Sequence, residues 1–334
     1  MLQAEPRLPE GSVSTEVSDR VLITGATGFV GSHITGTFAE AGYEVRCGLR
    51  STSDPRWLSG LRVERVSVDL TRREELAGAV KGVNTVIHAA GITRAYRKDD
   101  YYRINAEGTR RMAAAAAESG VRRFVLISSL AARGPDASTE NDRPVSPYGD
   151  SKLKAEEYLR SLEGRMETVV LRPAAVYGPR DTDLLPLFKM ASKGWLPIPS
   201  STNVLQAIYA ADAARAVLAA ARRSVGFGPL PLAEANRYSW YEVVTGIEKA
   251  LGRTVRAIRL PAALYRLAGR VAEEVATVCG SMPVFDERRA RDLAVHAWTC
   301  DPSSTEKALG WRAEVSLFEG LERTAHWYRR VGWI

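Results

Sequence analysis

Three side chains could together move a proton and hold a reacting oxygen. Tyr148 and Lys152 stand four residues apart in the run Y-G-D-S-K, and Ser129 follows Ser128 at the end of an apolar segment. Residues four apart share one face of a helix, so the Lys152 ammonium can lower the pKa of the Tyr148 phenol. Tyr148 could then exchange a proton with an oxygen that Ser129 holds, while hydride moves at the neighbouring carbon. An exposed helical pair is the alternative interpretation of Tyr148 and Lys152 alone.

A glycine-rich loop, T-G-A-T-G-F-V-G, follows the first β-rich run and opens a helical segment. Gly25 permits a tight turn, Gly28 lets the backbone approach a pyrophosphate, and Gly31 lets the helix pack against the strand. The helix N-terminus then offers free N–H groups to phosphates. This context predicts dinucleotide binding, with a purely structural turn as the alternative. The expected contacts are Thr24, Gly25, Thr27, Gly28, Phe29, Val30 and Gly31.

The end of the second predicted strand bears on the choice of cofactor. NAD-binding domains carry an acidic residue about 20 residues beyond the glycine loop, but Arg50 and Ser51 stand there and the nearest acid is Asp54. An arginine suits a 2′-phosphate through charge-assisted bonds. The sequence therefore predicts NADP, with NAD possible and a solvated surface arginine as the alternative for Arg50.

Further cofactor contacts are predicted where the next strands end. Asp69, followed by Leu70, could accept from the adenine amino group or cap the helix of residues 73–80. His88 is interpreted as a satisfied, partly buried side chain, and with no second histidine nearby no metal site is predicted. Small residues after His88 would let a cofactor lie close to the backbone. The other contacts expected at these strand ends and on the Tyr148 helix are Ala89, Ala90, Gly91, Ser128, Tyr148 and Lys152.

Strand-like and helical segments alternate from Arg20 to Arg172, which predicts an α/β fold with a doubly wound parallel Rossmann sheet. The predicted strands are Val21–Thr24, Glu44–Leu49, Val63–Val68, Thr85–Ala89, Arg123–Ser128 and Glu167–Leu171. The predicted helices are Gly31–Glu40, Arg73–Val80, Asn105–Ser119, Ser151–Leu162 and Ala210–Arg222. After Arg172, prolines and aromatic residues become frequent. We expect a flexible tail (1–18), a dinucleotide-binding domain (19–175, with 204–224 packing back on it) and a smaller, mainly substrate-binding region (176–334).

Composition excludes several classes of protein. With 45% hydrophobic and 25% charged residues, the 334-residue chain is not disordered. The net charge is +7, yet the arginines are scattered among acids, which disfavours nucleic acid as a partner. Cys47, Cys279 and Cys300 lie far apart, which favours a reducing, cytoplasmic location over a disulfide scaffold. No signal peptide or run of 18 apolar residues is evident, and residues 262–279 predict an amphipathic helix for a lid, an interface or membrane contact.

Taken together, the motifs resemble the extended short-chain dehydrogenase/reductase family, also called the epimerase/dehydratase family. T-G-A-T-G-F-V-G, H-A-A-G, N-A-E-G-T, S-S-L-A-A-R-G, Y-G-D-S-K and L-R-P-A-A-V-Y-G-P occur in family order. The resemblance implies Ser129, Tyr148 and Lys152 as catalytic residues. It also implies cofactor contacts around the N-A-E-G-T motif and beside the nicotinamide, at Asn105, Pro173, Ala174, Ala175 and Val176. We also expect a homodimer.

Two departures from subfamily patterns bear on the substrate. Nucleotide-sugar dehydratases carry an Asp-Glu pair where this chain has Leu130 and Ala131, and nucleotide-sugar epimerases usually carry an arginine where it has Leu205. The chain most resembles the branch with dihydroflavonol reductases and 3β-hydroxysteroid dehydrogenases. This implies an NADP-dependent reductase or dehydrogenase acting on a fairly apolar small molecule. The alternatives are a sugar or nucleotide-sugar epimerase with bound NAD, and an inactive dinucleotide-binding subunit. The substrate's identity and the reaction's direction stay open.

Overall fold

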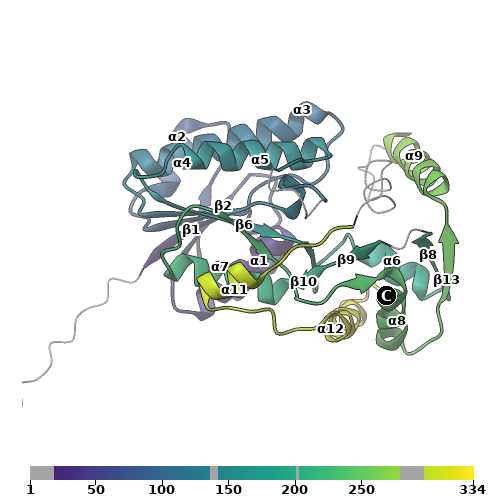
Figure 1. Ribbon diagram of the computed structural model, residues 1–334. Coiled ribbons are helices and arrows are strands. Elements are labelled where there is room, and N and C mark those ends of the chain that lie inside the picture. Colours follow the sequence, from purple (N-terminus) through teal and green to yellow (C-terminus); the bar gives the residue numbers. More distant parts are fainter. Residues whose placement is uncertain (1–18, 136–141, 201–202, 279–296) are drawn as a thin grey trace, which may run out of the picture.

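The computed structural model describes residues 19–135, 142–200, 203–278 and 297–334. The predicted tail (1–18) and Cys279 lie outside these residues. A seven-stranded parallel sheet carries helices on both faces, and a smaller region lies beyond one end of it (Figure 1). This confirms the predicted α/β fold with a doubly wound sheet.

The strand order of the main sheet fixes where a ligand can bind. The strands are β1 (Arg20–Thr24), β2 (Glu44–Leu49), β3 (Glu64–Ser67), β4 (Thr85–His88), β5 (Arg123–Ile127), β6 (Glu167–Pro173) and β11 (Pro229–Leu232). They lie in the order β3-β2-β1-β4-β5-β6-β11 and all pair in parallel. The order reverses between β1 and β4, and ligands bind at the carboxyl ends of strands at such a point. The edge strand β11 was not predicted, because its two prolines can be accommodated only at an edge.

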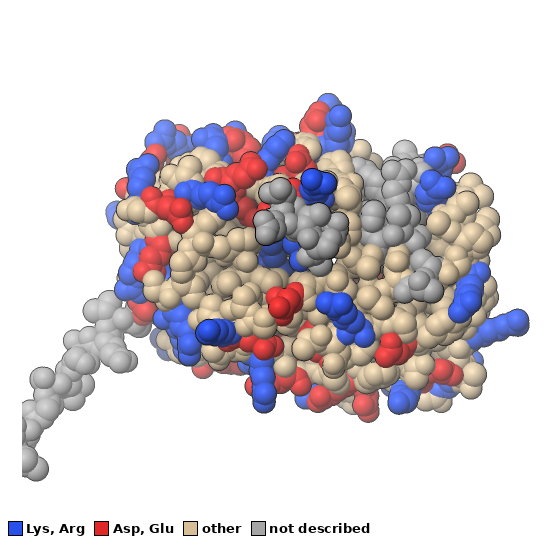
Figure 2. Space-filling model, in the orientation of Figure 1, with Lys and Arg blue, Asp and Glu red and all other residues tan. Residues whose placement is uncertain are grey.

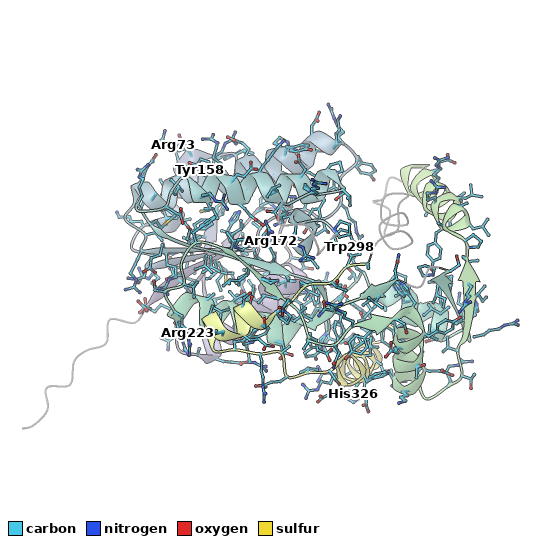
Figure 3. The ribbon with its side chains drawn as sticks, viewed as in Figure 1. Arg73, Tyr158, Arg172, Arg223, Trp298 and His326 are labelled. Atoms are coloured by element: carbon cyan, nitrogen blue, oxygen red, sulfur yellow. The ribbon has the colours of Figure 1, made fainter. Side chains whose placement is uncertain are left out.

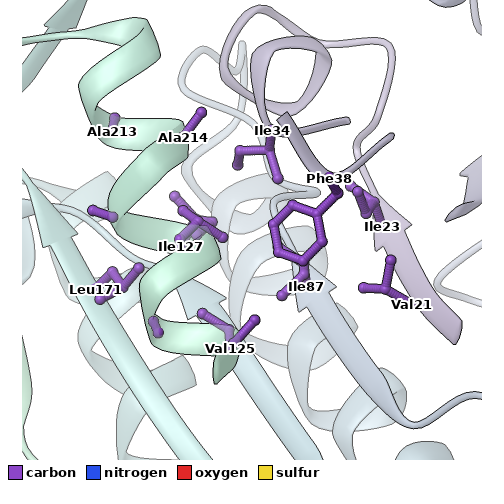
Figure 4. Close-up of a cluster of buried hydrophobic side chains, with 14 of the residues drawn as sticks. Val21, Ile23, Ile34, Phe38, Ile87, Val125, Ile127, Leu171, Ala213 and Ala214 are labelled. Atoms are coloured by element: carbon purple, nitrogen blue, oxygen red, sulfur yellow. The ribbon is translucent and has the colours of Figure 1, made fainter. Parts of the chain in front are cut away.

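Side chains of the central strands alternate between two apolar cores. Val21 and Ile23 pack with α1 (Phe29–Glu40) and α7 (Ala210–Arg222), as Figure 4 shows. Leu22, between them in sequence, enters the core on the other face with α2 (Arg73–Val80), α4 (Gly108–Glu118) and α5 (Pro147–Arg160). Burial on both faces explains why these strands are continuously apolar. The predicted helices Arg73–Val80 and Ala210–Arg222 have the bounds of α2 and α7.

Residues after β6 build a third apolar core, with Phe188 and Tyr328 fully buried in it. Its strands are β7 (Ala175–Tyr177), β8 (Trp195–Pro199), β9 (Val204–Leu205), β10 (Ala207–Tyr209), β12 (Tyr238–Ser239) and β13 (Arg256–Leu260). Its helices are α6 (Leu185–Ala191), α8 (Trp240–Leu251), α9 (Ala262–Val278) and α12 (Leu317–Arg330). The chain returns to the main sheet through α7, β11 and α11 (Ser303–Leu309). Among the described residues, no helix is both long enough and apolar enough to cross a membrane.

Short helical elements follow β4 and β5 and contribute to the site: α3 (Lys98–Tyr101), η2 (Tyr102–Glu107) and η3 (Leu130–Ala132). Another short element, η1 (Arg56–Leu58), follows β2. Helix α5 begins four residues earlier than predicted, because Pro147 fits the first helical position and the Ser146 hydroxyl accepts a bond from the Gly149 N–H at 3.1 Å. Tyr148 therefore lies in the first turn of α5.

Candidate active site

The glycine loop between β1 and α1 has the geometry of a phosphate cradle. Gly25 has φ of 70°, and a Cβ there would lie 2.7 Å from the backbone of Ala89 and Ala90. A Cβ on Gly31 would lie 2.0 Å from the Gly25 carbonyl oxygen. The N-cap residue Gly28 has no side chain to bond the first N–H groups of α1, so these remain available to an anion. The loop fits a dinucleotide pyrophosphate.

We expect Gly31→Ala to abolish measurable dinucleotide binding and to lower the free energy of unfolding by about 1–3 kcal/mol, since the new methyl group must displace backbone. Titration with NADPH and urea unfolding would measure the two effects. Gly36→Ala on the same helix is the matched control, because a Cβ there meets nothing within 4 Å. Unchanged dinucleotide binding by Gly31→Ala would contradict the assigned cradle.

Two connected hollows run along the carboxyl ends of the strands. The first, about 460 Å³, includes Arg50, Ser53 and Asp69, and the second, about 550 Å³, includes Ser129 and Lys152. Both are bordered by Gly25, Gly28, Ala89, Gly91 and Ile92. Of the other predicted cofactor contacts, those that line the first hollow are Thr24, Thr27, Leu70 and Ala90. Those that line the second hollow are Phe29, Val30, Gly31, Ser128, Tyr148, Pro173, Ala174 and Val176. Together they form one trough with room at one end for an adenosine and at the other for a nicotinamide.

Four predicted cofactor contacts lie outside this trough: Ser51, His88, Asn105 and Ala175, the last of which lines a separate cavity described below. His88 is fully rather than partly buried, bonds the Thr24 hydroxyl through Nδ1 at 2.8 Å and packs against Phe124. Its Nε2 atom has no hydrogen-bond partner among the described residues, so the expected satisfied side chain is satisfied at one ring nitrogen. Burial, with a smaller effect of the Lys152 charge, lowers the pKa of His88 to about 3, so the ring stays neutral. Ser51 is exposed and Ser53 lines the hollow in its place.

Asn105 has a supporting role in the structure rather than a place in the trough. It is buried in η2, and its amide bonds both the N–H (2.8 Å) and the carbonyl (3.0 Å) of Ile92. It also donates to the Ser151 hydroxyl on α5 at 3.1 Å. Asn105 therefore ties the loop after β4 to the helix that carries Tyr148.

Asp69 lines the first hollow but does not cap a helix. Its carboxylate accepts bonds from the N–H and hydroxyl of Thr71 at 2.8 and 2.7 Å, and α2 begins after Arg72 without a side-chain cap. The helix-cap interpretation of Asp69 is therefore wrong.

Ser129, Tyr148 and Lys152 converge on the second hollow. Ser129 immediately precedes η3, and the other two residues come from α5. A Cβ on Gly149 would lie 2.3 Å from the Ala131 carbonyl oxygen, so only glycine lets the start of α5 approach η3 this closely. The glycine of Y-G-D-S-K thus lets Tyr148 reach the same hollow as Ser129.

Lys152 is buried and held by backbone. Its ammonium donates to the Ile127 carbonyl at 2.9 Å. Burial lowers the pKa of Lys152 from 10.5 to about 8, and the Glu156 carboxylate opposes this shift. A Cβ on Gly91 would lie 3.4 Å from the Lys152 Nζ atom, so the ammonium lies against the wall of the trough.

A buried ionic network beneath the site was not predicted. Arg172, labelled in Figure 3, lies on β6. It donates from Nε to Glu156 at 3.0 Å and pairs with both oxygens of Asp142 at 2.7 Å. The Ser128 hydroxyl donates to Glu156. Glu156 follows Lys152 by four residues and Tyr148 by eight, so helical spacing alone could have placed all three on one face.

A third cavity, about 390 Å³, opens beside Ser129 and Tyr148 and extends into the third core. The 22 described residues that line it include no Lys, Arg, Asp, Glu or His. They include Ala175 and Leu205, together with Tyr177, Leu187 and Trp298 from several elements. Trp298 lies between the main sheet and the smaller region in Figure 3. Within the described residues, no group of three or more His, Cys, Asp or Glu could hold a metal ion.

Comparison with known proteins identifies relatives over almost the whole chain. A ceramide reductase of Caulobacter vibrioides is 34% identical over 325 residues, covering 96% of this chain and 98% of the relative. A UDP-glucose 4-epimerase of Vibrio cholerae is 27% identical, covering 91% and 94%. The solved structure of MoeE5 with UDP-glucuronic acid and NAD is 26% identical, with a TM-score of 0.74, covering 93% of this chain and 99% of that one.

The family assignment rests on a family profile together with the 34% identical relative. The profile described as "NAD dependent epimerase/dehydratase family" matches residues 21–228. A putative dihydroflavonol 4-reductase of Synechocystis is 26% identical, covering 95% of this chain and 97% of the relative. The chain belongs to the NAD-dependent epimerase/dehydratase family of extended short-chain dehydrogenases/reductases.

Proposed function

We propose that the chain is an NADP-dependent carbonyl reductase or alcohol dehydrogenase whose substrate is an apolar, lipid-like molecule. The third cavity carries the proposal, because the described part of its wall has no charged side chain and it adjoins Ser129 and Tyr148. An apolar wall with a few polar groups at one end suits a hydrophobic molecule with one reactive oxygen. The relative named ceramide reductase supports the same class of substrate.

The three residues at the junction of the hollows would handle the substrate oxygen. A bound nicotinamide supplies or accepts the hydride. The Tyr148 phenol gives its proton to the forming alkoxide, and the nearby Lys152 ammonium stabilises the phenolate left behind. The Ser129 oxygen already accepts a bond from the Ala131 N–H at 3.2 Å. Its hydroxyl proton is therefore available to the substrate oxygen, where it stabilises the developing charge.

The nucleotide-sugar epimerase is the competing function, because UDP-sugar enzymes are among the relatives. Its ligand carries a diphosphate, and an unpaired buried charge is costly to desolvate. Leu205 lines the cavity, whereas Arg180 stacks on Trp57 and Arg237 is exposed, and neither of them belongs to the described wall. Lys189 is also exposed. These placements favour the reductase.

Thermal unfolding with NADPH and candidate ligands would separate the two functions. We expect long-chain ketones and steroid ketones to stabilise the complex, and UDP-glucose to have little effect. Marked stabilisation by UDP-glucose, with none by apolar ketones, would favour the epimerase instead.

We expect the wild type to bind NADPH more tightly than NADH, and Arg50→Asp to remove or reverse that preference. A charge-assisted bond to the 2′-phosphate contributes about 1.5–3 kcal/mol, and Arg50 lines the adenosine end of the trough with Ser53. Calorimetric titration of both cofactors measures the effect. Arg62→Asp is the control, because Arg62 is exposed and lines neither hollow. A wild type that prefers NADH would refute the NADP assignment.

The homodimer and the cytoplasmic location stay predictions from the sequence. The thiols of Cys47 and Cys300 are free and buried, which fits a reducing compartment. We keep residues 19–175, with 204–224, as the proposed dinucleotide-binding domain and 176–334 as the mainly substrate-binding region.

A further inference from the structure

Exposed apolar side chains gather at the end of the molecule formed by β8, β13, α9 and the start of α8. Single exposed apolar residues are ordinary, whereas a gathering marks an interaction site. Of the nine large hydrophobic side chains exposed on the described surface, six lie here: Trp195, Tyr241, Ile258, Leu264, Leu267 and Val271. This end lies away from the parallel sheet (Figure 1).

Helix α9 turns an apolar row away from the protein. Leu264, Leu267 and Val271 are 48%, 55% and 52% exposed, and their spacing of three and four residues puts them on one face. Tyr265 and Gly269, also four apart, are buried on the opposite side, and the Tyr265 hydroxyl donates to the Pro197 carbonyl at 2.7 Å. The helix is therefore held by one face, while the apolar row faces outward.

The same segment is strongly basic. Residues 252–272 contain no Asp or Glu, and acids return only at Glu273 and Glu274. The segment's five arginines are all exposed: Arg253, Arg256, Arg259, Arg266 and Arg270. Figure 2 shows lysine and arginine side chains on the visible face of this end. A second copy of the chain seated here would meet like charges, whereas an anionic surface would be attracted.

We propose that the face of α9 formed by Leu264, Leu267 and Val271, flanked by Arg266 and Arg270, binds the surface of an anionic lipid bilayer. An amphipathic helix with arginines beside its apolar row lies in the plane of such a surface, with the apolar side chains among the acyl chains. The exposed Trp195 and Tyr241 are of the types enriched at membrane–water boundaries. The inference goes beyond the proposed reaction, since this binding needs neither cofactor nor substrate.

Co-sedimentation of the full chain with vesicles tests the proposal. We expect binding to phosphatidylcholine–phosphatidylglycerol vesicles, weakening with salt, and little binding to phosphatidylcholine alone. Leu267→Ser should weaken the binding about 10-fold, and Arg266→Gln with Arg270→Gln about 5-fold for each arginine removed. The controls are Val331→Ser and Arg73→Gln, exposed positions outside α9 that should bind as the wild type does.

Several results would overturn the proposal. The wild type could fail to sediment with anionic vesicles, or both α9 variants could bind as tightly as the wild type. If light scattering showed that Leu267→Ser instead converts a dimer into a monomer, α9 would be a self-association face. Oxidation of NADPH with a water-soluble ketone should be unchanged in the α9 variants, so failure of membrane binding is distinguishable from failure of the proposed function.

Discussion

We expect Tyr148→Phe to lower kcat by about 10²–10⁴-fold while leaving dinucleotide binding close to that of the wild type. The substitution removes only the phenolic oxygen, and a positioned general acid typically contributes that factor. Tyr148 lines both the second hollow of the trough and the apolar cavity, and phenylalanine keeps the aromatic ring that lines them. Steady-state turnover and calorimetric titration with NADPH measure the two quantities separately.

Two companion variants sharpen this prediction. Tyr158→Phe removes the same atom from the same helix at a residue that lines none of the described hollows, and it should keep full activity. Lys152→Met should damage both turnover and dinucleotide binding, since that ammonium lies in the trough wall. Substantial activity in Tyr148→Phe would show that another group supplies the proton and would revive the inactive-subunit alternative.

The second large effect concerns stability. We expect Arg172→Met to lower the free energy of unfolding by about 3–5 kcal/mol, because it leaves the Glu156 carboxylate buried without its cation. That is a large fraction of the roughly 5–15 kcal/mol that stabilises a typical protein. Urea unfolding of both proteins measures the difference.

The controls separate this network from a general effect of losing an arginine. Arg165→Met, at an exposed position, should change stability little. The double variant Arg172→Met with Glu156→Leu should recover part of the loss, since it removes the stranded charge as well. A single Arg172→Met variant as stable as the wild type would mean that Glu156 is buried uncharged.

The regular part of the fold was predictable because each βαβ unit is encoded locally. The six predicted strands agree with β1–β6 to within two residues. Burial on both faces makes β1, β4 and β5 nearly continuous apolar runs, whereas β3 is mostly exposed. The small strands β9 and β12 contain two residues each, too few for a period-2 pattern to be recognised. Their pairing depends on distant segments that only the folded chain brings together.

The site was predictable where residues close together in the sequence fix its geometry. The glycine loop and Y-G-D-S-K are local, and they lie in one trough. Asp142 and Arg172 are separated by 30 residues, and Arg94 and Asp183, an ion pair in the trough wall, by 89. No local spacing signals such pairs. His88 and Asn105 were predicted as cofactor contacts but lie outside the trough. A residue within or beside a motif can be buried behind the site that the motif forms.

Oxidation of NADPH against two substrates tests the central claim most directly. The wild type would be supplied either with the ketone of a ceramide-type lipid in detergent or with UDP-glucose, and absorbance of the reduced cofactor would be followed. We predict steady oxidation with the lipid ketone, lost in Tyr148→Phe, and none with UDP-glucose. Conversion of UDP-glucose to its epimer without net NADPH consumption, together with no reaction of the lipid ketone, would contradict the proposed reductase.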